Sequence, residues 1–212
     1  MKVLELFAGT GSVGKVFKEH GWEVLSLDRD MPADIRADIM EWDYRAYPPK
    51  TFDIIWASPP CTEYSIAKTT GTRKLDEANR VSQRTLEIID YFQPKYYFIE
   101  NPQTGLLKHQ PFMQDRPYSD VDYCRYGMPY RKRTRLWNNL PLFYPLKCNR
   151  LCGVMTEDRR RHINIAQHTP KVPPDTWVPG SRTFGTKALY MVPRQLTESI
   201  VTCIMFHELL SL

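Results

Sequence analysis

The chain has 212 residues, 42% of them hydrophobic and 25% charged, which excludes a disordered polymer and allows one domain with a full core. The formal net charge of +5 favours a polyanionic partner, and twelve tyrosines, nine phenylalanines and five tryptophans can stack on bases. No membrane-spanning or secretory segment is evident, and five cysteines are an odd number. We expect an intracellular, unsecreted protein with reduced thiols and no membrane partner, and we take it to be a monomer.

Strand and helix patterns alternate through the first part of the chain. An apolar run predicts a strand over Lys2–Phe7, and Ser12 is a candidate N-cap for a helix that reaches about His20. Helical spacing is also expected over Asp76–Phe92. This rhythm predicts an α/β fold with a doubly wound, mostly parallel sheet. The further expected strands are Glu23–Leu27, Phe52–Ala57, Lys95–Ile99, Val121–Cys124 and Thr134–Trp137.

Residues 140–190 differ in character, because proline, basic residues and short apolar pieces dominate and no clear period is present. We place the end of the regular sheet domain near Leu140, which gives a first domain over residues 1–139. A last amphipathic helix is expected over Pro193–Leu209, so that residues 191–212 pack back on the first domain.

The loop after the first expected strand is rich in glycine and opens a helix. Glycines let the backbone approach a ligand closely, and a helix N-terminus offers free N–H groups. Asp28 ends the second strand, where a carboxylate can accept from both ribose hydroxyls, and Asp38 with Ile39 is placed to meet an adenine amino group. These features predict a site for a nucleotide-type cofactor. The alternative is a plain tight turn after a strand.

A second group of residues follows two later strands. Cys61 comes directly after Ser58-Pro59-Pro60, a stiff turn at the same sheet edge, and its thiolate is suited to attack an electron-poor ring carbon. The alternative is a small buried cysteine. Glu100 ends another strand and can hydrogen-bond a ring nitrogen, or act only as a cap or ion-pair partner. Arg133 and Arg135 point to one face of a strand, unless this basic run is a solvated loop.

A metal site is a separate hypothesis for the proline-rich segment. Cys148 and Cys152 are followed by His162 and His168, and four nitrogen and sulfur ligands in this order suit tetrahedral zinc. A loop-rich segment with little core would be stabilised by such an ion. The alternative is two loop cysteines and two surface histidines.

Taken in chain order, these motifs resemble those of the DNA cytosine-5 methyltransferases, in particular their short phage and viral members. The cofactor motif F-x-G-x-G corresponds to Phe7–Gly11, and the nucleophile motif P-P-C-x-x-x-S to Pro59–Ser65. The E-N-V motif appears with proline as its third residue, Glu100-Asn101-Pro102. The Q-x-R-x-R motif appears over residues 131–135, with arginine in place of glutamine.

The resemblance implies a Rossmann-like methyltransferase fold that uses S-adenosylmethionine and acts on DNA from which the target cytosine is flipped out. It implies that Cys61 attacks cytosine C6 and that Glu100 bonds N3. Arg135, with Arg133, would contact the base carbonyl. The implied cofactor-binding set is Phe7, Ala8, Gly9, Thr10, Gly11, Ser12, Asp28, Arg29, Asp38, Ile39 and Pro59.

Three points stay open at this stage. Residues 140–190 are few for a target-recognition region, although a zinc ion there would hold the loops in shape. The same chemistry on RNA is one alternative, and a catalytically silent nucleic-acid-binding module is another. The compartment would be the cytoplasm, or the host nucleus for a viral protein.

Overall fold

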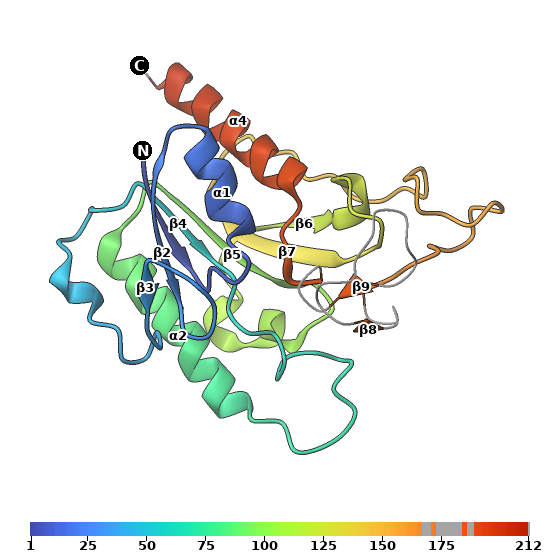
Figure 1. Cartoon of the computed structure of the whole chain (residues 1–212), viewed down its shortest axis with the longest axis horizontal. Coiled ribbons are helices and arrows are strands. Elements are labelled where there is room, and N and C mark those ends of the chain that lie inside the picture. The colour runs from blue at the N-terminus through green and yellow to red at the C-terminus, as the bar shows by residue number, and fades with distance from the viewer. Residues whose placement is uncertain (167–170, 173–183, 186–188, 212) are drawn as a thin grey trace.

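The protein is built on a seven-stranded sheet with the strand order β3-β2-β1-β4-β5-β7-β6 (Figure 1). The computed structural model describes residues 1–166, 171–172, 184–185 and 189–211. The strands of the sheet are β1 Lys2–Leu6, β2 Glu23–Asp28, β3 Ile35–Arg36, β4 Ile54–Ala57, β5 Tyr96–Pro102, β6 Tyr118–Asp122 and β7 Arg133–Asn138.

The first five strands are parallel, and β7 is antiparallel to both β5 and β6. This mostly parallel, doubly wound arrangement confirms the predicted α/β class. A separate pair, β8 Lys171–Val172 and β9 Phe184–Gly185, forms a small parallel sheet outside the main one.

Helices cover both faces of the sheet. Helix α1 (Ser12–Glu19) lies beside α4 (Arg194–Leu210) on one face, and α2 (Leu75–Phe92) covers the other (Figure 1). Among the helices that the structure describes, none is long and apolar enough to cross a membrane. Four short 3-10 helices complete the described elements: η1 Tyr44–Ala46, η2 Leu106–His109, η3 Pro111–Met113 and η4 Tyr123–Arg125.

Alternation along the strands divides the core into two layers. In β1, Val3 packs with Phe17 of α1, while Leu4 packs with Ile89 of α2 on the opposite face. All four of these side chains are buried. Ile200 of α4 belongs to the same layer as Val3 and Phe17. The strands are therefore apolar on both faces, as expected for a parallel sheet covered by helices.

Two local expectations are wrong. The strand expected over Val121–Cys124 ends at Asp122, and the chain then turns into η4, so Cys124 lies in a 3-10 helix. Ser12 does not cap α1, because Gly11 occupies the N-cap position and the Ser12 hydroxyl accepts a hydrogen bond from Val192 N–H at 3.1 Å. That bond instead ties the chain just before α4 to the start of α1.

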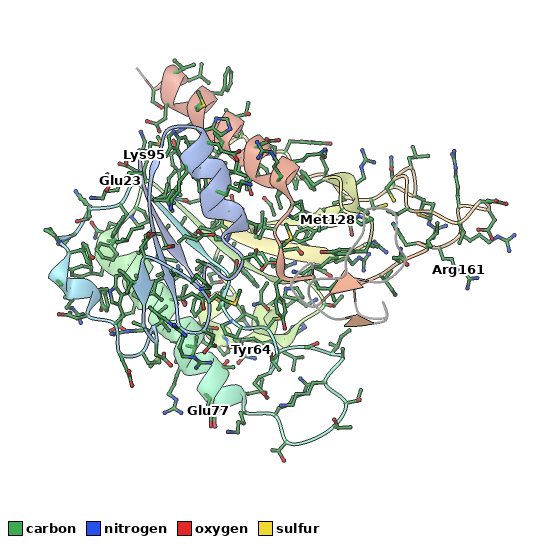
Figure 2. All side chains as sticks on the ribbon, viewed as in Figure 1. Glu23, Tyr64, Glu77, Lys95, Met128 and Arg161 are labelled. Carbon is green, nitrogen blue, oxygen red and sulfur yellow. The ribbon has the colours of Figure 1, made fainter. Side chains whose placement is uncertain are left out.

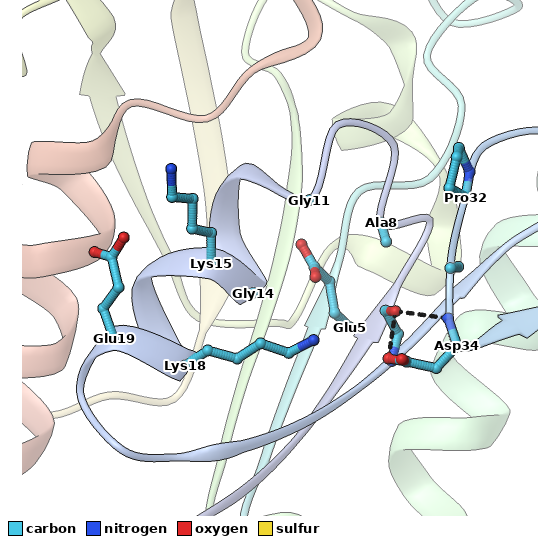
Figure 3. Close-up of a pocket in the computed structure, with 11 residues that line it drawn as sticks. Glu5, Ala8, Gly11, Gly14, Lys15, Lys18, Glu19, Pro32 and Asp34 are labelled. Carbon is cyan, nitrogen blue, oxygen red and sulfur yellow. Dashed lines mark hydrogen bonds between the residues drawn. The ribbon is translucent and has the colours of Figure 1, made fainter.

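A buried carboxyl group lies between β1 and α1. The side chain of Glu5 points toward Gly14, beside a surface hollow of about 680 Å³ (Figure 3). A Cβ atom at position 14 would collide with the Glu5 carboxylate and lie 3.2 Å from Val24 Cγ1, so a larger residue here would displace the Glu5 side chain. Burial is the main reason that the pKa of Glu5 rises to about 7.

This raised pKa predicts that stability falls with increasing pH. The folded protein binds a proton at Glu5 more tightly than the unfolded chain, so the contribution is complete below about pH 4.5 and is lost as the pH rises through about 7. The loss is up to about 3 kcal/mol, at roughly 1.36 kcal/mol for each pKa unit. Urea unfolding from pH 4.5 to 8 should show this decline in the wild type and not in Glu5→Gln. The exposed control Glu41→Gln should keep the decline. If Glu5→Gln also keeps it, the pH dependence of stability comes from other groups.

Candidate active site

A cavity of about 560 Å³ opens at the carboxyl ends of the parallel strands. Its walls come from the loop after β1, the end of β2, the chain after β3, the turn after β4 and the end of β5. It contains most of the residues predicted from sequence for the cofactor and the reaction. These are Phe7, Ala8, Gly9, Thr10, Ser12, Asp28, Arg29, Asp38, Ile39, Pro59, Cys61 and Glu100.

The glycine loop is shaped by three residues with left-handed backbone, Phe7 at φ +58° and two glycines. Gly9 has φ +55° and Gly11 has φ +67°, values that L side chains rarely adopt. Gly9 N–H donates to Asp28 Oδ2 at 2.8 Å, which fixes the loop against the end of β2. Gly11 lines the hollow behind α1 instead of the cavity, so its role is to start the helix.

Asp28 organises the backbone around the cavity. Besides Gly9, its carboxylate accepts hydrogen bonds from Asp30 N–H at 2.9 Å and Met31 N–H at 2.8 Å. Nearby, Asp38 forms an ion pair with Arg29 at 3.4 Å. The structure thus brings these carboxylates to the cavity, and their contacts with ribose and adenine stay predictions.

The turn that carries Cys61 is held by the strand that carries Glu100. Asn101 Nδ2 donates to the carbonyl oxygen of Pro59 at 2.9 Å, and the Asn101 side chain is fully buried. Sequence reasoning gave Asn101 no role. One signal was available: Asn101 directly follows the strand-end carboxylate. An amide side chain there can donate a hydrogen bond to a buried carbonyl group of a neighbouring loop.

Glu100 is a buried carboxylate with two partners. Tyr123 Oη donates to Glu100 Oε1 at 2.9 Å, and Lys132 Nζ lies 3.3 Å from the same oxygen. Burial raises the pKa of the Cys61 thiol, the charge of Glu100 raises it further, and the charge of Lys132 lowers it. Lys132 therefore acts on both predicted catalytic groups.

The predicted arginine pair does not reach this cavity. In the β5–β7 register Glu100 pairs with Leu136, so the even-numbered residues of β7 share its face and Arg133 and Arg135 lie on the other. Arg135 binds Asp120 at 2.7 Å and stacks 3.5 Å from the ring centre of Tyr118. Arg133 is exposed. Lys132, one residue before the strand, lines the cavity and is the basic side chain beside Glu100 there.

The segment before α4 closes another side of the cavity. Tyr190 and Val192 line it, and Val192 is held there by its bond to Ser12. Sequence analysis missed both residues because they lie about 180 positions away from the glycine loop and belong to no local motif.

The predicted metal ligands meet elsewhere. Cys148, Cys152 and His162 lie together, and Cys124 joins them from η4. These four ligand atoms lie within 4.8 Å of one another. His168, predicted as the fourth ligand, lies outside the described residues.

Comparison with known proteins identifies the family. The sequence profile described as C-5 cytosine-specific DNA methylase matches residues 1–113. A probable DNA (cytosine-5)-methyltransferase of Frog virus 3 (isolate Goorha) is 38% identical over 163 residues, which cover 70% of this chain and 75% of the viral protein. The chain belongs to the C-5 cytosine-specific DNA methylase family. This membership assigns it S-adenosylmethionine-dependent methylation of cytosine in DNA.

Two further matches are to longer proteins. The type II methyltransferase M.AgeI of Thalassovita gelatinovora is 24% identical over 172 residues, which cover 63% of this chain and 38% of that protein. A solved structure, a putative DNA modification methyltransferase encoded within an E. coli prophage, has a TM-score of 0.51 and 16% identity. The match covers 70% of this chain and 52% of that one, and it shows the shared fold.

The position of Lys132 generates a prediction about thiol reactivity. Lys132→Gln removes the charge that lowers the pKa of Cys61, so alkylation of Cys61 by iodoacetamide at pH 7.5 should slow severalfold and its pH profile should move to higher pH. Peptide mass spectrometry resolves Cys61 from the other thiols. Arg133→Gln should leave the profile in place. A shift caused by Arg133→Gln and not by Lys132→Gln would restore the arginine assignment.

Proposed function

We propose that this methylase transfers a methyl group to C5 of cytosine in DNA through a covalent bond between Cys61 and C6. One observation carries the proposal: a single cavity contains the glycine loop, the thiol of Cys61 and the carboxylate of Glu100. A cofactor in one half of such a cavity would lie next to a base in the other half.

The residues present suit S-adenosylmethionine. Residues of the glycine loop and of the start of α1 line the cavity, as do Asp28 and Asp38, which carry carboxylates, and the apolar Phe7 and Ile39. Hydroxyl and amino groups of a nucleoside need such acceptors, and an adenine ring needs such apolar walls. When bound, the cofactor supplies the methyl group.

The steps on the protein's side follow from the positions of two groups. The Cys61 thiolate adds to C6 of the flipped cytosine while the Glu100 carboxyl group donates a proton to N3. The electrons of the C5–C6 double bond then form an enamine, in which C5 is nucleophilic. C5 then takes the methyl group, and N3 returns its proton to Glu100. A base removes the C5 proton, and the C6–sulfur bond breaks to release Cys61 as a thiolate.

Lys132 and Tyr123 are assigned a supporting role in this mechanism. Both contact Glu100 Oε1, so they hold the carboxylate in one orientation in a buried place. The ammonium group of Lys132 also favours the thiolate of Cys61, whose burial otherwise favours the neutral thiol.

Target recognition is assigned to the segment that begins at residue 140. Its described part, residues 140–166, projects from the β6–β7 side of the sheet, and Arg161 lies near its tip (Figure 2). Tyr144 is 82% exposed. Arg159 and Arg160, which precede Arg161, are exposed as well. Exposed aromatic and basic side chains are suited to contact bases and phosphates.

The covalent step is tested by trapping. DNA with 5-fluorocytosine at the target should form a stable adduct with the wild type in the presence of cofactor, because fluorine cannot leave as a proton does. Cys61→Ser should bind the cofactor and form no adduct, and its turnover should fall on the order of 10²-fold or more, as expected for loss of a positioned nucleophile. Cys203→Ser, which changes a thiol of α4, is the control. Full turnover by Cys61→Ser would overturn the mechanism.

A further inference from the structure

A cluster of three cysteines and one histidine lies outside the cavity. Cys124 comes from η4, while Cys148, Cys152 and His162 come from the projecting segment. All five cysteines of the chain are free thiols, so no disulfide accounts for the cluster. Neither the fold nor the proposed methyl transfer uses these four side chains.

The distances suit one tetrahedral ion. Zinc bonds of about 2.3 Å to sulfur and 2.0–2.1 Å to nitrogen would hold neighbouring ligand atoms roughly 3.5–3.8 Å apart. His162 Nε2 lies 3.2 Å from Cys148 Sγ, 3.3 Å from Cys152 Sγ and 3.6 Å from Cys124 Sγ. The sulfurs of Cys148 and Cys152 are 3.5 Å apart. One ring nitrogen thus lies against three sulfurs, which is more than hydrogen bonding by weak thiol donors explains.

The surroundings of the cluster resemble the outer ligand shell of a metal site. Arg150 N–H donates to Cys148 Sγ at 3.4 Å, and Cys148 N–H donates to Asp122 Oδ2 at 2.7 Å. The other oxygen of Asp122 accepts from Arg131 Nε at 3.0 Å. Such bonds to ligand sulfurs and to the ligand backbone hold a site in shape.

The four ligands join two parts of the chain. Residues 152–163 fold back on themselves, with a bridge between Met155 and His162 and a bond from Ile163 N–H to the carbonyl of Val154 at 2.9 Å. Cys152 and His162 lie at the base of this turn. Cys124, in contrast, belongs to η4, whose first residue is Tyr123, the partner of Glu100.

We propose that Cys124, Cys148, Cys152 and His162 bind one structural zinc ion that fastens the projecting segment to the end of β6. Three thiolates and one imidazole fill all four positions of a tetrahedral ion, so no position is open for a substrate. The ion stabilises a loop-rich segment that has few buried apolar side chains of its own. Cys124 takes the place that sequence analysis gave to His168.

Metal content tests this proposal without using methyl transfer. The full chain, purified without chelators from zinc-supplemented cells, should contain about one zinc per molecule by elemental mass spectrometry. Cys152→Ser and Cys124→Ser should lose most of it, whereas Cys203→Ser should keep it. Cobalt(II) added to the metal-free wild type should give the intense visible bands of tetrahedral thiolate coordination, and the ligand variants should not.

Two further variants keep the proposal falsifiable if the buried Cys124→Ser fails to fold. His162→Ala changes a more exposed ligand, and Cys152→His keeps four ligands and should retain zinc. Cofactor binding, measured on the same samples, reports whether the cavity is intact, because no member of the cluster lines it. A folded wild type that neither contains zinc nor takes up cobalt would overturn the proposal, as would zinc that persists in Cys152→Ser and His162→Ala.

Discussion

The parallel register of β1, β2, β4 and β5 is the constraint on which the site depends. Leu6 pairs with Leu27 on one side and with Ala57 on the other, and Ala57 pairs with Ile99. These four residues form one row across the sheet, so the residues that follow them form the next row, at the cavity. That next row is Asp28, Phe7, Ser58 and Glu100.

A hydrogen bond then links the turn that carries Cys61 to the strand that carries Glu100, the two groups proposed to be catalytic. The turn from Ser58 to Cys61 extends beyond this row of residues. The Asn101 side chain fixes the turn by donating a hydrogen bond to the carbonyl oxygen of Pro59. Because Asn101 follows Glu100 directly, the nucleophile and the carboxylate share one rigid support. Loops at strand ends can vary in length and sequence while this row keeps the reacting groups together, which is why such sheet edges often hold ligand sites.

Sequence alone predicted the sheet and the parts of the site that follow strands directly. Each of these residues is at a fixed offset from an apolar run, so the strand pattern locates it. The arginine prediction rested on alternation as well, but it lacked the register between β5 and β7, which decides the face that Glu100 shares. Only the pairing of the two strands shows that Lys132 is on that face and Arg135 is not.

The remaining differences come from contacts between distant parts of the chain. Sequence analysis did not include Cys124 among the metal ligands, because its partners lie 24 or more positions later, across a segment without periodicity. Ser12 precedes an expected helix as N-caps do, yet its hydroxyl binds the backbone of Val192. Neither contact leaves a local signal, because each depends on the way the chain returns to the sheet.

The projecting segment and the sheet meet next to Glu100, the proposed catalytic carboxylate. Tyr123 contacts Glu100, and the following residue, Cys124, belongs to the cluster that we assign to zinc. The proposed ion would therefore fasten the segment proposed to read DNA one residue away from a partner of Glu100. Bound there, the ion would give the proposed recognition segment a fixed orientation relative to the cavity, which a freely hinged loop would lack.

The central claim is that this cavity methylates carbon 5 of cytosine in DNA. The most direct measurement incubates the protein with methyl-labelled S-adenosylmethionine and duplex DNA, single-stranded DNA or tRNA in parallel, and identifies the labelled nucleosides by mass spectrometry. The account predicts labelled 5-methyldeoxycytidine from duplex DNA. Label on an exocyclic amino group, or label confined to tRNA, would contradict it.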